Sequence, residues 1–382
     1  MKCKNCLLPD AVPGANIDAQ GVCAYCRQRR TVDLESEEQQ RVERQRDLEL
    51  ALDSCRGEGE YDCIVMLSGG KDSCYLLHKI KHDYGLNALA FTVNIHVPDI
   101  AWKNIHQTVA RLEVPHITYT PPKQLYRRLF RFLLQNQNAR GAVRTVCYVC
   151  APLTEGYALK LAVEKNIPLI LAGYSPGQPD PDRMVYEFPK AMITETDWIP
   201  QEIRGSGQFS KADLQLFWNP ANYPADTRFP RYLAPFHAWR YNQTEVMKTV
   251  VELGLVRNTR HASPILSNCP VNWLLMYSDL KNLGYNSYAP EFAALIREKK
   301  ASRRYWRLLG PLVDFMIRKQ ILLGKHVKKA LKWLDLNPSD LRITRGEPDI
   351  NNVCPSEDRC QLEEMNDAEI RDLEEVCADE PQ

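Results

Sequence analysis

A short apolar run followed by a glycine pair constrains the fold of this chain more than any other stretch of its sequence. The run Cys63 to Leu67 has the length of a buried strand, and the apolar residues from Leu76 to Ile80 recur at helical spacing. Ser68 to Gly70 join the two, and glycines without Cβ atoms let consecutive backbone N–H groups turn inward at the start of the helix. The stretch therefore predicts a strand, a tight turn and a helix, with an anion site at the turn.

The three residues after the glycines supply the groups that a phosphate site needs. Lys71 offers a point charge to phosphate oxygens, Ser73 offers a hydroxyl donor, and Asp72 lies in the first helical turn, where a carboxylate is favoured. The spacing differs from that of the Walker loop, G-x-x-x-x-G-K-[ST]. The other interpretation of this stretch is a Gly-Gly turn that carries an exposed lysine.

SGGKDS resembles the signature of the PP-loop ATP pyrophosphatases, the adenine nucleotide alpha hydrolase-like superfamily. The resemblance implies that ATP, with Mg²⁺, is split between its α and β phosphates and that AMP is left on a substrate oxygen. It also implies catalytic roles for Lys71 and Asp72. The residues that it implies for nucleotide binding are Ser68, Gly69, Gly70, Lys71, Asp72, Ser73 and Gly173.

Apolar runs and helical patterns alternate after Tyr61, which predicts parallel strands joined by helical crossovers. The pattern places further strands at Ala88 to Ile95, His116 to Tyr119 and Pro168 to Ala172, and helices at 102–112, 124–134 and 153–163. We expect an α/β fold, a doubly wound parallel sheet of the HUP-like type, with ligands beyond the carboxyl ends of the strands. The PP-loop resemblance implies that Gly173 lets the backbone approach the nucleotide and that Thr92 to Asn94 lie near adenine.

Two CxxC pairs open the chain, Cys3 with Cys6 and Cys23 with Cys26. Their spacing is that of a tetrahedral zinc site, and four thiolates fill the coordination sphere of a structural ion. Because so short a segment buries no core of its own, the metal supplies its folding energy. We expect a zinc knuckle over residues 1–30 in preference to an iron–sulfur cluster. The segment also resembles the N-terminal knuckle of PP-loop N-acetyl sugar amidotransferases.

A second set of cysteines lies further along the chain, where Cys147 and Cys150 precede the strand that ends at Gly173 and Cys269 follows much later. Chain order places the CxxC pair near the sheet edge that carries the phosphate loop. A CxxC joined by one distant cysteine resembles the iron–sulfur-dependent PP-loop sulfur transferases that thiolate tRNA. That resemblance implies a [4Fe-4S] cluster on the three thiolates, catalytic roles for Cys147 and Cys150, and an open fourth iron that binds hydrosulfide. Two other interpretations remain open, namely a redox or second zinc site and inert thiols buried as small hydrophobes.

Composition and patterning divide the chain into five regions. After the knuckle, residues 31–58 are charge-rich, contain no proline and end in glycines, as expected of a solvated connecting helix. The PP-loop ATP-binding domain is expected at 59–268. It includes a long irregular insertion at 174–235, which is either a lid over a reactive adenylate or surface decoration. A helical region is expected at 269–345 and an acidic tail at 346–382.

Basic segments with aromatic residues mark the C-terminal helical region, REKKASRRYWR and RKQILLGKHVKKALKWL. Amphipathic helices that pack their apolar faces explain this pattern, and a local RNA-binding surface is the alternative. Cys354, Cys360 and Cys377 lie at no standard ligand spacing and are left unassigned.

Composition places the chain among globular proteins of a reducing compartment. Of the 382 residues, 44% are hydrophobic, and no stretch reaches the roughly 18 uninterrupted apolar residues of a membrane span. The start, MKCKNC, has no apolar h-region, so we expect a cytoplasmic protein without membrane contact. In that compartment the 13 cysteines favour metal sites over disulfides. The net charge of +1 removes the global field of a nucleic-acid binder.

The leading hypothesis is an ATP-dependent transferase that adenylates a substrate oxygen, releases pyrophosphate and replaces the oxygen with sulfur from the three-cysteine site. The alternative is amidation of an N-acetyl sugar with ammonia from a partner glutaminase subunit, as the knuckle indicates. A non-catalytic nucleotide- and RNA-binding module ranks last because Lys71, Asp72 and Ser73 are all present. The tRNA-modifying relatives often carry G-H-x-x-D-D where this chain has GYSPGQ, so a small-molecule acceptor is favoured over tRNA. Neither the sulfur donor protein nor the oligomeric state follows from the sequence, and a homodimer is compatible with it.

Overall fold

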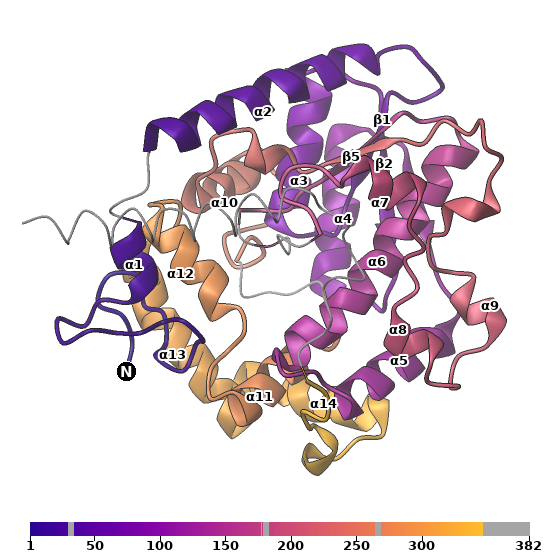
Figure 1. The fold of residues 1–382 in the computed structure, drawn as a ribbon. Coiled ribbons are helices and arrows are strands. Elements are labelled where there is room, and N and C mark those ends of the chain that lie inside the picture. Colours follow the sequence, from indigo (N-terminus) through magenta and orange to yellow (C-terminus); the bar gives the residue numbers. More distant parts are fainter. Residues whose placement is uncertain (30–33, 177, 179–182, 264–268, 347–382) are drawn as a thin grey trace, which may run out of the picture. The chain divides into compact units, whose positions relative to one another are not determined.

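A computed structural model describes residues 1–29, 34–176, 178, 183–263 and 269–346 of the chain (Figure 1). These ranges contain a five-stranded sheet made of β1 (Cys63–Met66), β2 (Ala88–Val93), β3 (His116–Tyr119), β4 (Leu169–Ala172) and β5 (Arg231–Leu233). The strand order is β3-β2-β1-β4-β5, and every neighbouring pair is parallel. The predicted α/β fold with a doubly wound parallel sheet is confirmed.

Helices surround this sheet and fill the N- and C-terminal parts of the chain. Those in the first half are α1 (Ala24–Gln28), α2 (Leu34–Ser54), α3 (Lys71–His78), α4 (Asp99–Leu112), α5 (Lys123–Gln135) and α6 (Gly141–Glu164). Those in the second half are α7 (Lys190–Thr194), α8 (Gln201–Arg204), α9 (Lys211–Leu214), α10 (Gln243–Glu252), α11 (Asn272–Asn282), α12 (Ala289–Arg297), α13 (Arg303–Lys319) and α14 (Lys325–Leu334). A π-helical turn, Lys79–Asp83, extends α3, and single 3₁₀ turns lie at Pro220–Asn222, Pro235–His237, Leu322–Gly324 and Pro338–Asp340.

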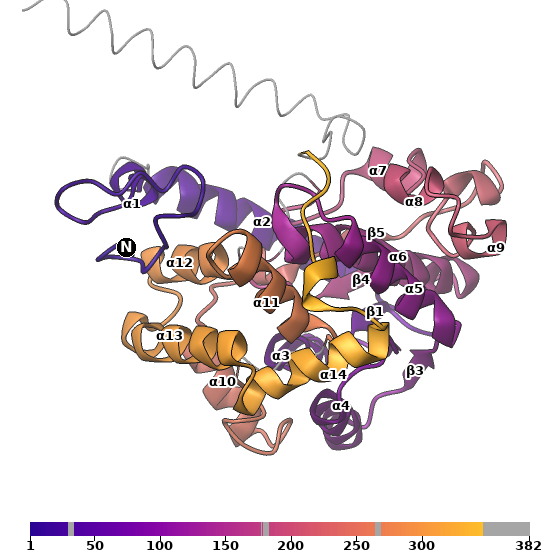
Figure 2. The ribbon, with the colours of Figure 1, turned by 90° about the horizontal axis from the view of Figure 1, so that it is seen from below.

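The two faces of the sheet carry different helices because successive strand residues point to opposite sides. On one face Val65 and Leu171 pack in a core with Leu76 of α3, Ile105 of α4 and Val250 of α10. On the other face α6 contacts β1, β2 and β4, and α5 and α11 pack on α6. The turned view places α3 and α4 on one side of the strands and α5 and α6 on the other (Figure 2). Burial on both faces explains why the strands read as continuous apolar runs.

The insertion after β4 was predicted to be irregular, but the structure contains helices and a strand in it. It contains α7, α8 and α9 and ends in β5, the outermost strand, which pairs with β4. A strand of only three residues among prolines is too short for its pattern to be detected in the sequence. Trp218 and Tyr232 of this segment are fully buried, and a Cβ added at Gly156 of α6 would lie 3.1 Å from the Trp218 nitrogen. The described part of the insertion is therefore packed against α6, and its function as a lid stays a prediction.

The N-terminal knuckle packs against helices from the far end of the chain. Leu8 and Val12 share a buried cluster with Ile296 of α12 and Trp306 of α13, and both ribbon views place α1 beside these helices (Figures 1 and 2). Residues 1–348 form one compact unit. The predicted acidic tail lies outside the described residues from position 347 onward, as do Cys354, Cys360 and Cys377.

One helix of the described ranges, α6, is long and apolar enough to cross a membrane by length and composition alone. Of its most apolar window, 61% is buried inside the protein. This is the behaviour of a core helix.

Candidate functional site

The glycine pair after β1 forms a tight turn against α4. Gly69 has φ +77°, and a Cβ there would lie 2.4 Å from the backbone oxygen of Ala101. Asn104 of α4 donates from Nδ2 to the Gly69 oxygen at 2.9 Å and to the His261 oxygen at 3.1 Å. The amide thus fixes the direction of the Gly69 peptide, and α3 begins immediately afterwards at Lys71 with its unpaired N–H groups. The strand, the tight turn and the helix that the sequence predicts are therefore present in the structure.

The Ser73 hydroxyl binds backbone groups of the loop. Its Oγ donates to the Gly70 oxygen at 3.0 Å and accepts from the Ser68 nitrogen at 3.2 Å. The sequence predicts that this hydroxyl donates to phosphate, whereas in the structure it closes the first turn of α3. Such hydroxyl bonds to nearby backbone groups stabilise tight turns at helix starts.

Lys71, Asp72 and Tyr241 form a closed polar network at the start of α3. Lys71 Nζ lies 2.5 Å from Asp72 Oδ2 and 3.3 Å from the Tyr241 hydroxyl, which donates to Asp72 Oδ1 at 2.9 Å. All three residues are buried. Burial, and then the neighbouring carboxylate of Asp72, raise the pKa of Tyr241, so the phenol remains a donor at neutral pH. The network holds the cationic group that phosphate oxygens would need.

Gly173 follows β4 and lies against the same loop. A Cβ at this position would lie 2.9 Å from the Ser73 nitrogen, so the end of β4 can lie this close to the first turn of α3 because Gly173 has no side chain. β1 lies between β2 and β4, and the strand order reverses there. The crevice beyond the carboxyl ends of strands at such a point is the usual ligand site of an open α/β sheet.

A cavity of about 560 Å³ lies at this point. Its lining contains every residue predicted to bind nucleotide, together with Thr92 at the end of β2; Asn94 is not among its lining residues. All three predicted cluster cysteines line it as well. Among the knuckle cysteines, Cys6 alone reaches the wall, beside Lys2 and Leu7.

The three cavity cysteines come from two packed elements. Cys147 and Cys150 lie three residues apart on α6, so they share a face, and Cys269 lies just before α11, which packs on α6. The surrounding protein raises the pKa of Cys147 to about 12 and that of Cys269 to about 11, and it raises the pKa of Cys150 as well. Burial is the main reason for the raised pKa of Cys147 and Cys150, and the charge of Cys269 is the second. The three thiols are therefore electrostatic neighbours. The thiols are protonated at neutral pH, and any metal that they bind must displace these protons.

The positions of the ligand atoms indicate which residues could bind a single metal ion. Within the described residues, the four knuckle cysteines are the one set of three or more His, Cys, Asp or Glu whose ligand atoms all lie within 4.8 Å of one another. Cys147, Cys150 and Cys269 are not part of that set. Thiolates that bind separate irons of a cluster do not need to converge on one ion.

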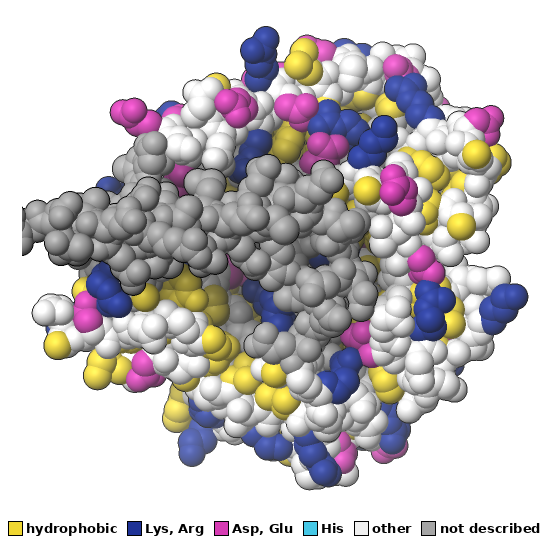
Figure 3. Space-filling view, in the orientation of Figure 1, with side chains coloured by type: hydrophobic (Ala, Val, Ile, Leu, Met, Phe, Trp, Pro, Cys, Tyr) yellow, Lys and Arg dark blue, Asp and Glu magenta, His cyan; other side chains and the backbone are white. Residues whose placement is uncertain are grey.

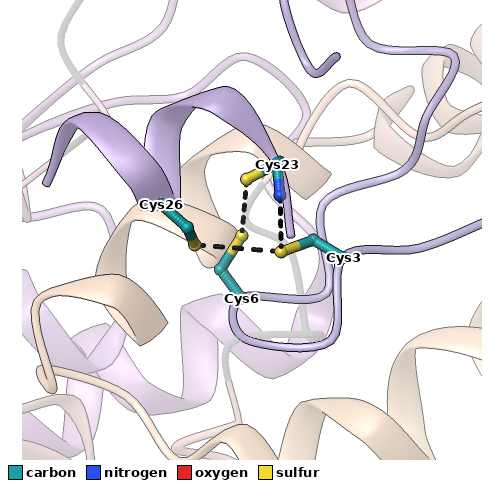
Figure 4. A group of neighbouring side chains, drawn as sticks. All are labelled: Cys3, Cys6, Cys23 and Cys26. Carbon is teal, nitrogen blue, oxygen red and sulfur yellow. Dashed lines mark hydrogen bonds between the residues drawn. The ribbon is translucent and has the colours of Figure 1, made fainter. Parts of the chain in front are cut away.

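The knuckle cysteines do converge, as zinc requires. Cys3 Sγ lies 3.8 Å from Cys26 Sγ, and Cys6 Sγ lies 3.5 Å from Cys23 Sγ. Tetrahedral zinc with bonds of about 2.3 Å places its sulfur ligands about 3.8 Å apart. All four sulfur atoms point into one space between the N-terminal loop and the start of α1 (Figure 4). The backbone nitrogen of Cys23 donates to Cys3 Sγ at 3.3 Å, a bond that favours the thiolate.

Several residues that surround the phosphate loop or line the cavity were not found from the sequence. Tyr241 and Asn104 meet the phosphate loop only through tertiary contacts, and no local pattern marks them. Glu155 was detectable in principle, as a carboxylate in the middle of the apolar helix α6; it pairs with Arg183 at 2.6 Å. Glu291 of α12 also lines the cavity, where burial raises its pKa to about 7 against the opposing charge of Lys71.

Gly69→Ala is expected to abolish MgATP binding and to destabilise the fold, because its Cβ would lie 2.4 Å from a backbone oxygen of α4. Gly57→Ala is the matched control: Gly57 has φ +69°, and an added Cβ would meet nothing within 4 Å. The control carries only the strain of a positive φ, about 1–2 kcal/mol. Calorimetric MgATP titration and thermal unfolding measure both effects. Equal behaviour of the two variants would show that the contact with α4 is unimportant.

No family model and no curated protein matches this chain. Three solved structures resemble it at low identity. The U34-tRNA thiolase NcsA from Methanococcus maripaludis, solved with its [4Fe-4S] cluster, is 13% identical, with 93% of this chain and 96% of that chain covered and a TM-score of 0.35. NMN synthetase from Francisella tularensis is 12% identical, covers 83% of this chain and 99% of its own, and has a TM-score of 0.34. NH3-dependent NAD synthetase from Campylobacter jejuni, in complex with the nitrate ion, is 13% identical over 70% and 94%, with a TM-score of 0.33.

Similarity at this level does not define a reaction, and the assignment of the fold rests on the chain's own topology. The parallel order β3-β2-β1-β4-β5 places the SGGKDS turn after the central strand, and Gly173 lies against that turn from the end of the neighbouring strand. The protein has an α/β fold built on a five-stranded parallel sheet, with a four-cysteine cluster before it and a set of helices after it.

Proposed function

We propose that this chain is an ATP-dependent transferase that adenylates an oxygen of an acceptor and then replaces that oxygen with sulfur. The observation that carries the proposal is the shared cavity: the phosphate loop and Cys147, Cys150 and Cys269 line the same space. An adenylate formed at the loop would not need to leave the protein to meet the thiols. Reactive adenylates are hydrolysed in water, so a site that the loop and the thiols share favours transfer.

The first half-reaction uses the phosphate loop. The acceptor oxygen attacks the α-phosphorus of ATP, the bond between the α-phosphorus and the bridging oxygen breaks, and pyrophosphate leaves with the electron pair. Backbone N–H groups from Ser68 to Gly70 and the Lys71 ammonium would stabilise the charge on that leaving group, with Mg²⁺ from the nucleotide complex. Gly173 permits the nucleotide to lie close to the backbone between β1 and β4.

The second half-reaction is assigned to the three cysteines. They would hold a [4Fe-4S] cluster as thiolates, and the cluster would supply an open iron for a hydrosulfide ion. Their placement on α6 and before α11 keeps them on the wall of the cavity that also contains the loop.

The compartment and the acceptor are part of the proposal. Within the described ranges, Cys3, Cys6, Cys23, Cys26, Cys55, Cys63, Cys74, Cys147 and Cys150 are free thiols, as expected in a reducing cytoplasm. Where side chains are coloured in Figure 3, lysine, arginine and acidic residues are interspersed, and the net charge is +1, which does not favour tRNA. We therefore place the acceptor among small molecules, with tRNA as the second choice.

Metal analysis of protein purified without oxygen tests the proposal. The wild type is expected to contain about four irons and four acid-labile sulfides per chain with a brown chromophore. The Cys147→Ala/Cys150→Ala/Cys269→Ala variant is expected to lose both and to keep its zinc. Zinc is the internal control, since the variant leaves the four knuckle cysteines intact.

The same measurement also tests the alternative function, amidation of an N-acetyl sugar. Amidation with ammonia from a partner glutaminase needs none of the three cavity cysteines, and the resemblance of the knuckle to sugar amidotransferases supports that reaction. A wild type without iron or sulfide, and a triple variant of unchanged activity, would reject sulfur transfer. Amidation of an N-acetyl sugar would then be the leading function of the same fold.

A further inference from the structure

The helix α13 carries apolar side chains on two opposite sides. The members of the buried side are Trp306, Val313, Met316 and Ile317. On the other side Leu308, Leu312 and Phe315 recur at i, i+4 and i+7, so they form one stripe. Leu308 is 68% exposed, and the other two are each 51% exposed. A second apolar stripe that is left in water marks a surface for contact with another molecule.

Two more exposed apolar side chains lie in the turn that joins α13 to α14, which packs on α13. Ile321 is 42% exposed and Leu322 is 67% exposed. Backbone bonds hold the turn: the Ile321 nitrogen donates to the Met316 oxygen at 3.1 Å, and the Gly324 nitrogen donates to the Ile321 oxygen at 2.8 Å. Within the described ranges eleven large apolar residues are exposed, and five of them lie between positions 308 and 322. Exposed apolar area is therefore concentrated at this end of the chain.

Positive charge surrounds these five apolar residues. Positions 303–334 contain nine lysines and arginines and one acidic residue, Asp314, so their net charge is +8 in a chain whose total is +1. Asp314 lines the cavity and lies 3.9 Å from Lys2. All nine basic residues are exposed: Arg303, Arg304, Arg307, Arg318, Lys319, Lys325, Lys328, Lys329 and Lys332. We call the five apolar and nine basic residues together the α13–α14 surface.

We infer that the α13–α14 surface binds an anionic membrane surface, with its apolar side chains inserted among the lipids. Helices that lie in a bilayer interface combine leucine and phenylalanine on one side with lysine and arginine around them. Each basic residue near an anionic leaflet adds attraction. The sequence predicts no membrane contact because it contains no spanning stretch, and a stripe of three residues is not detected in that way. The inference goes beyond the proposed function and does not depend on the reaction.

RNA and a second copy of this chain fit the α13–α14 surface less well. An RNA surface needs aromatic residues that stack on bases, but Trp306 is buried and Trp333 packs edge-on against Phe130 with centroids 6.1 Å apart. Four of the five exposed apolar residues are aliphatic. A symmetric contact between two copies would bring the same positive charges together. Anionic lipids supply both the negative charge and the apolar interior.

Sedimentation of the full-length protein with phospholipid vesicles tests the inference. We expect binding to phosphatidylcholine vesicles that contain about one third phosphatidylglycerol, and at least about tenfold weaker binding to phosphatidylcholine alone. Leu308→Ser/Leu312→Ser is expected to weaken binding at least about tenfold, because it removes two inserted side chains. Lys319→Gln/Lys325→Gln is expected to have a similar effect and to make binding less sensitive to salt. Thermal unfolding should be nearly unchanged in both variants, since all four side chains are exposed.

Leu50→Ser is the matched control. Leu50 is 62% exposed on α2, whose charged residues are mostly acidic, and its loss is expected to leave vesicle binding within about twofold of the wild type. A wild type that does not bind anionic vesicles, or a double leucine variant that binds them as well as Leu50→Ser, would overturn the inference.

Two further outcomes would also overturn it. Tighter binding to single-stranded RNA than to vesicles, unaffected by the leucine substitutions, would assign the α13–α14 surface to RNA. A dimer in solution that the leucine substitutions dissociate would assign it to a second copy of this chain. Because none of these measurements contains ATP, each outcome leaves the proposed function unchanged.

Discussion

Pyrophosphate release from MgATP is expected to fall at least about a hundredfold when Lys71 is replaced by alanine, the usual effect of removing one group that stabilises developing charge. Lys71 is buried at the start of α3 and lines the cavity beside the glycine turn, so bulk water cannot replace its charge. Its loss leaves the backbone N–H groups alone to balance the pyrophosphate. The rate is measured as AMP formed from radiolabelled ATP, separated by chromatography.

Lys79→Ala is the matched control for this prediction. Lys79 lies in the π-helical turn that extends α3, where its ammonium pairs with Asp83 at 2.6 Å and lies 4.8 Å from the centre of the Trp239 ring. It is not among the residues that line the cavity. We expect its removal to change the rate by no more than about twofold. If Lys71→Ala formed AMP as fast as Lys79→Ala, the phosphate loop would not act in adenylation.

The phosphate loop was predictable because its geometry is local. Gly69 needs a positive φ and contact with a neighbouring backbone, and a side chain at that position excludes both, so the glycine itself carries the information. The apolar run before it and the helical spacing after it are equally local. The first strand and the helix α3 were therefore identified close to their observed ends.

The groups that complete the site were not predictable, because they depend on long-range packing. Tyr241 lies between β5 and α10 in the chain, and its contact with Asp72 depends on the pairing of β5 with β4 and on the packing of α10 on α3. β5 itself has three residues, which is too few for any periodicity. Asn104 holds the Gly69 oxygen from α4, and its sequence context is that of an ordinary amphipathic helix.

The two cysteine sets show the same distinction. The knuckle spacing predicts convergence of four sulfur atoms within one segment of 24 residues, Cys3 to Cys26, and the structure has them within 4.8 Å of one another. The cavity set joins α6 to a residue more than a hundred positions later. Its members line one cavity because α6 and α11 pack together, a contact that the sequence does not encode locally.

Cys23→Ala is expected to reduce the zinc content from about one ion per chain to nearly none, because three thiolates leave a structural zinc site incomplete. The knuckle then loses the metal that organises it, and Leu8 and Val12 no longer pack on Ile296 and Trp306. Each large apolar side chain is worth about 1.5–3 kcal/mol when buried, so the two together predict a loss of about 3–6 kcal/mol. Elemental analysis and calorimetric unfolding measure the two effects.

Cys55→Ala separates the loss of metal from the loss of a buried thiol. Cys55 is 2% exposed beneath the end of α2 and belongs to the sheet core, not to the knuckle. It should keep its zinc and lose only about 1 kcal/mol, as small core truncations do. The knuckle also contributes Lys2, Cys6 and Leu7 to the cavity wall, so zinc removal by a chelator should weaken MgATP binding as well. If Cys23→Ala kept its zinc and its unfolding temperature, the four thiols would not form a structural metal site, and the knuckle would be held by its packing on α12 and α13 alone.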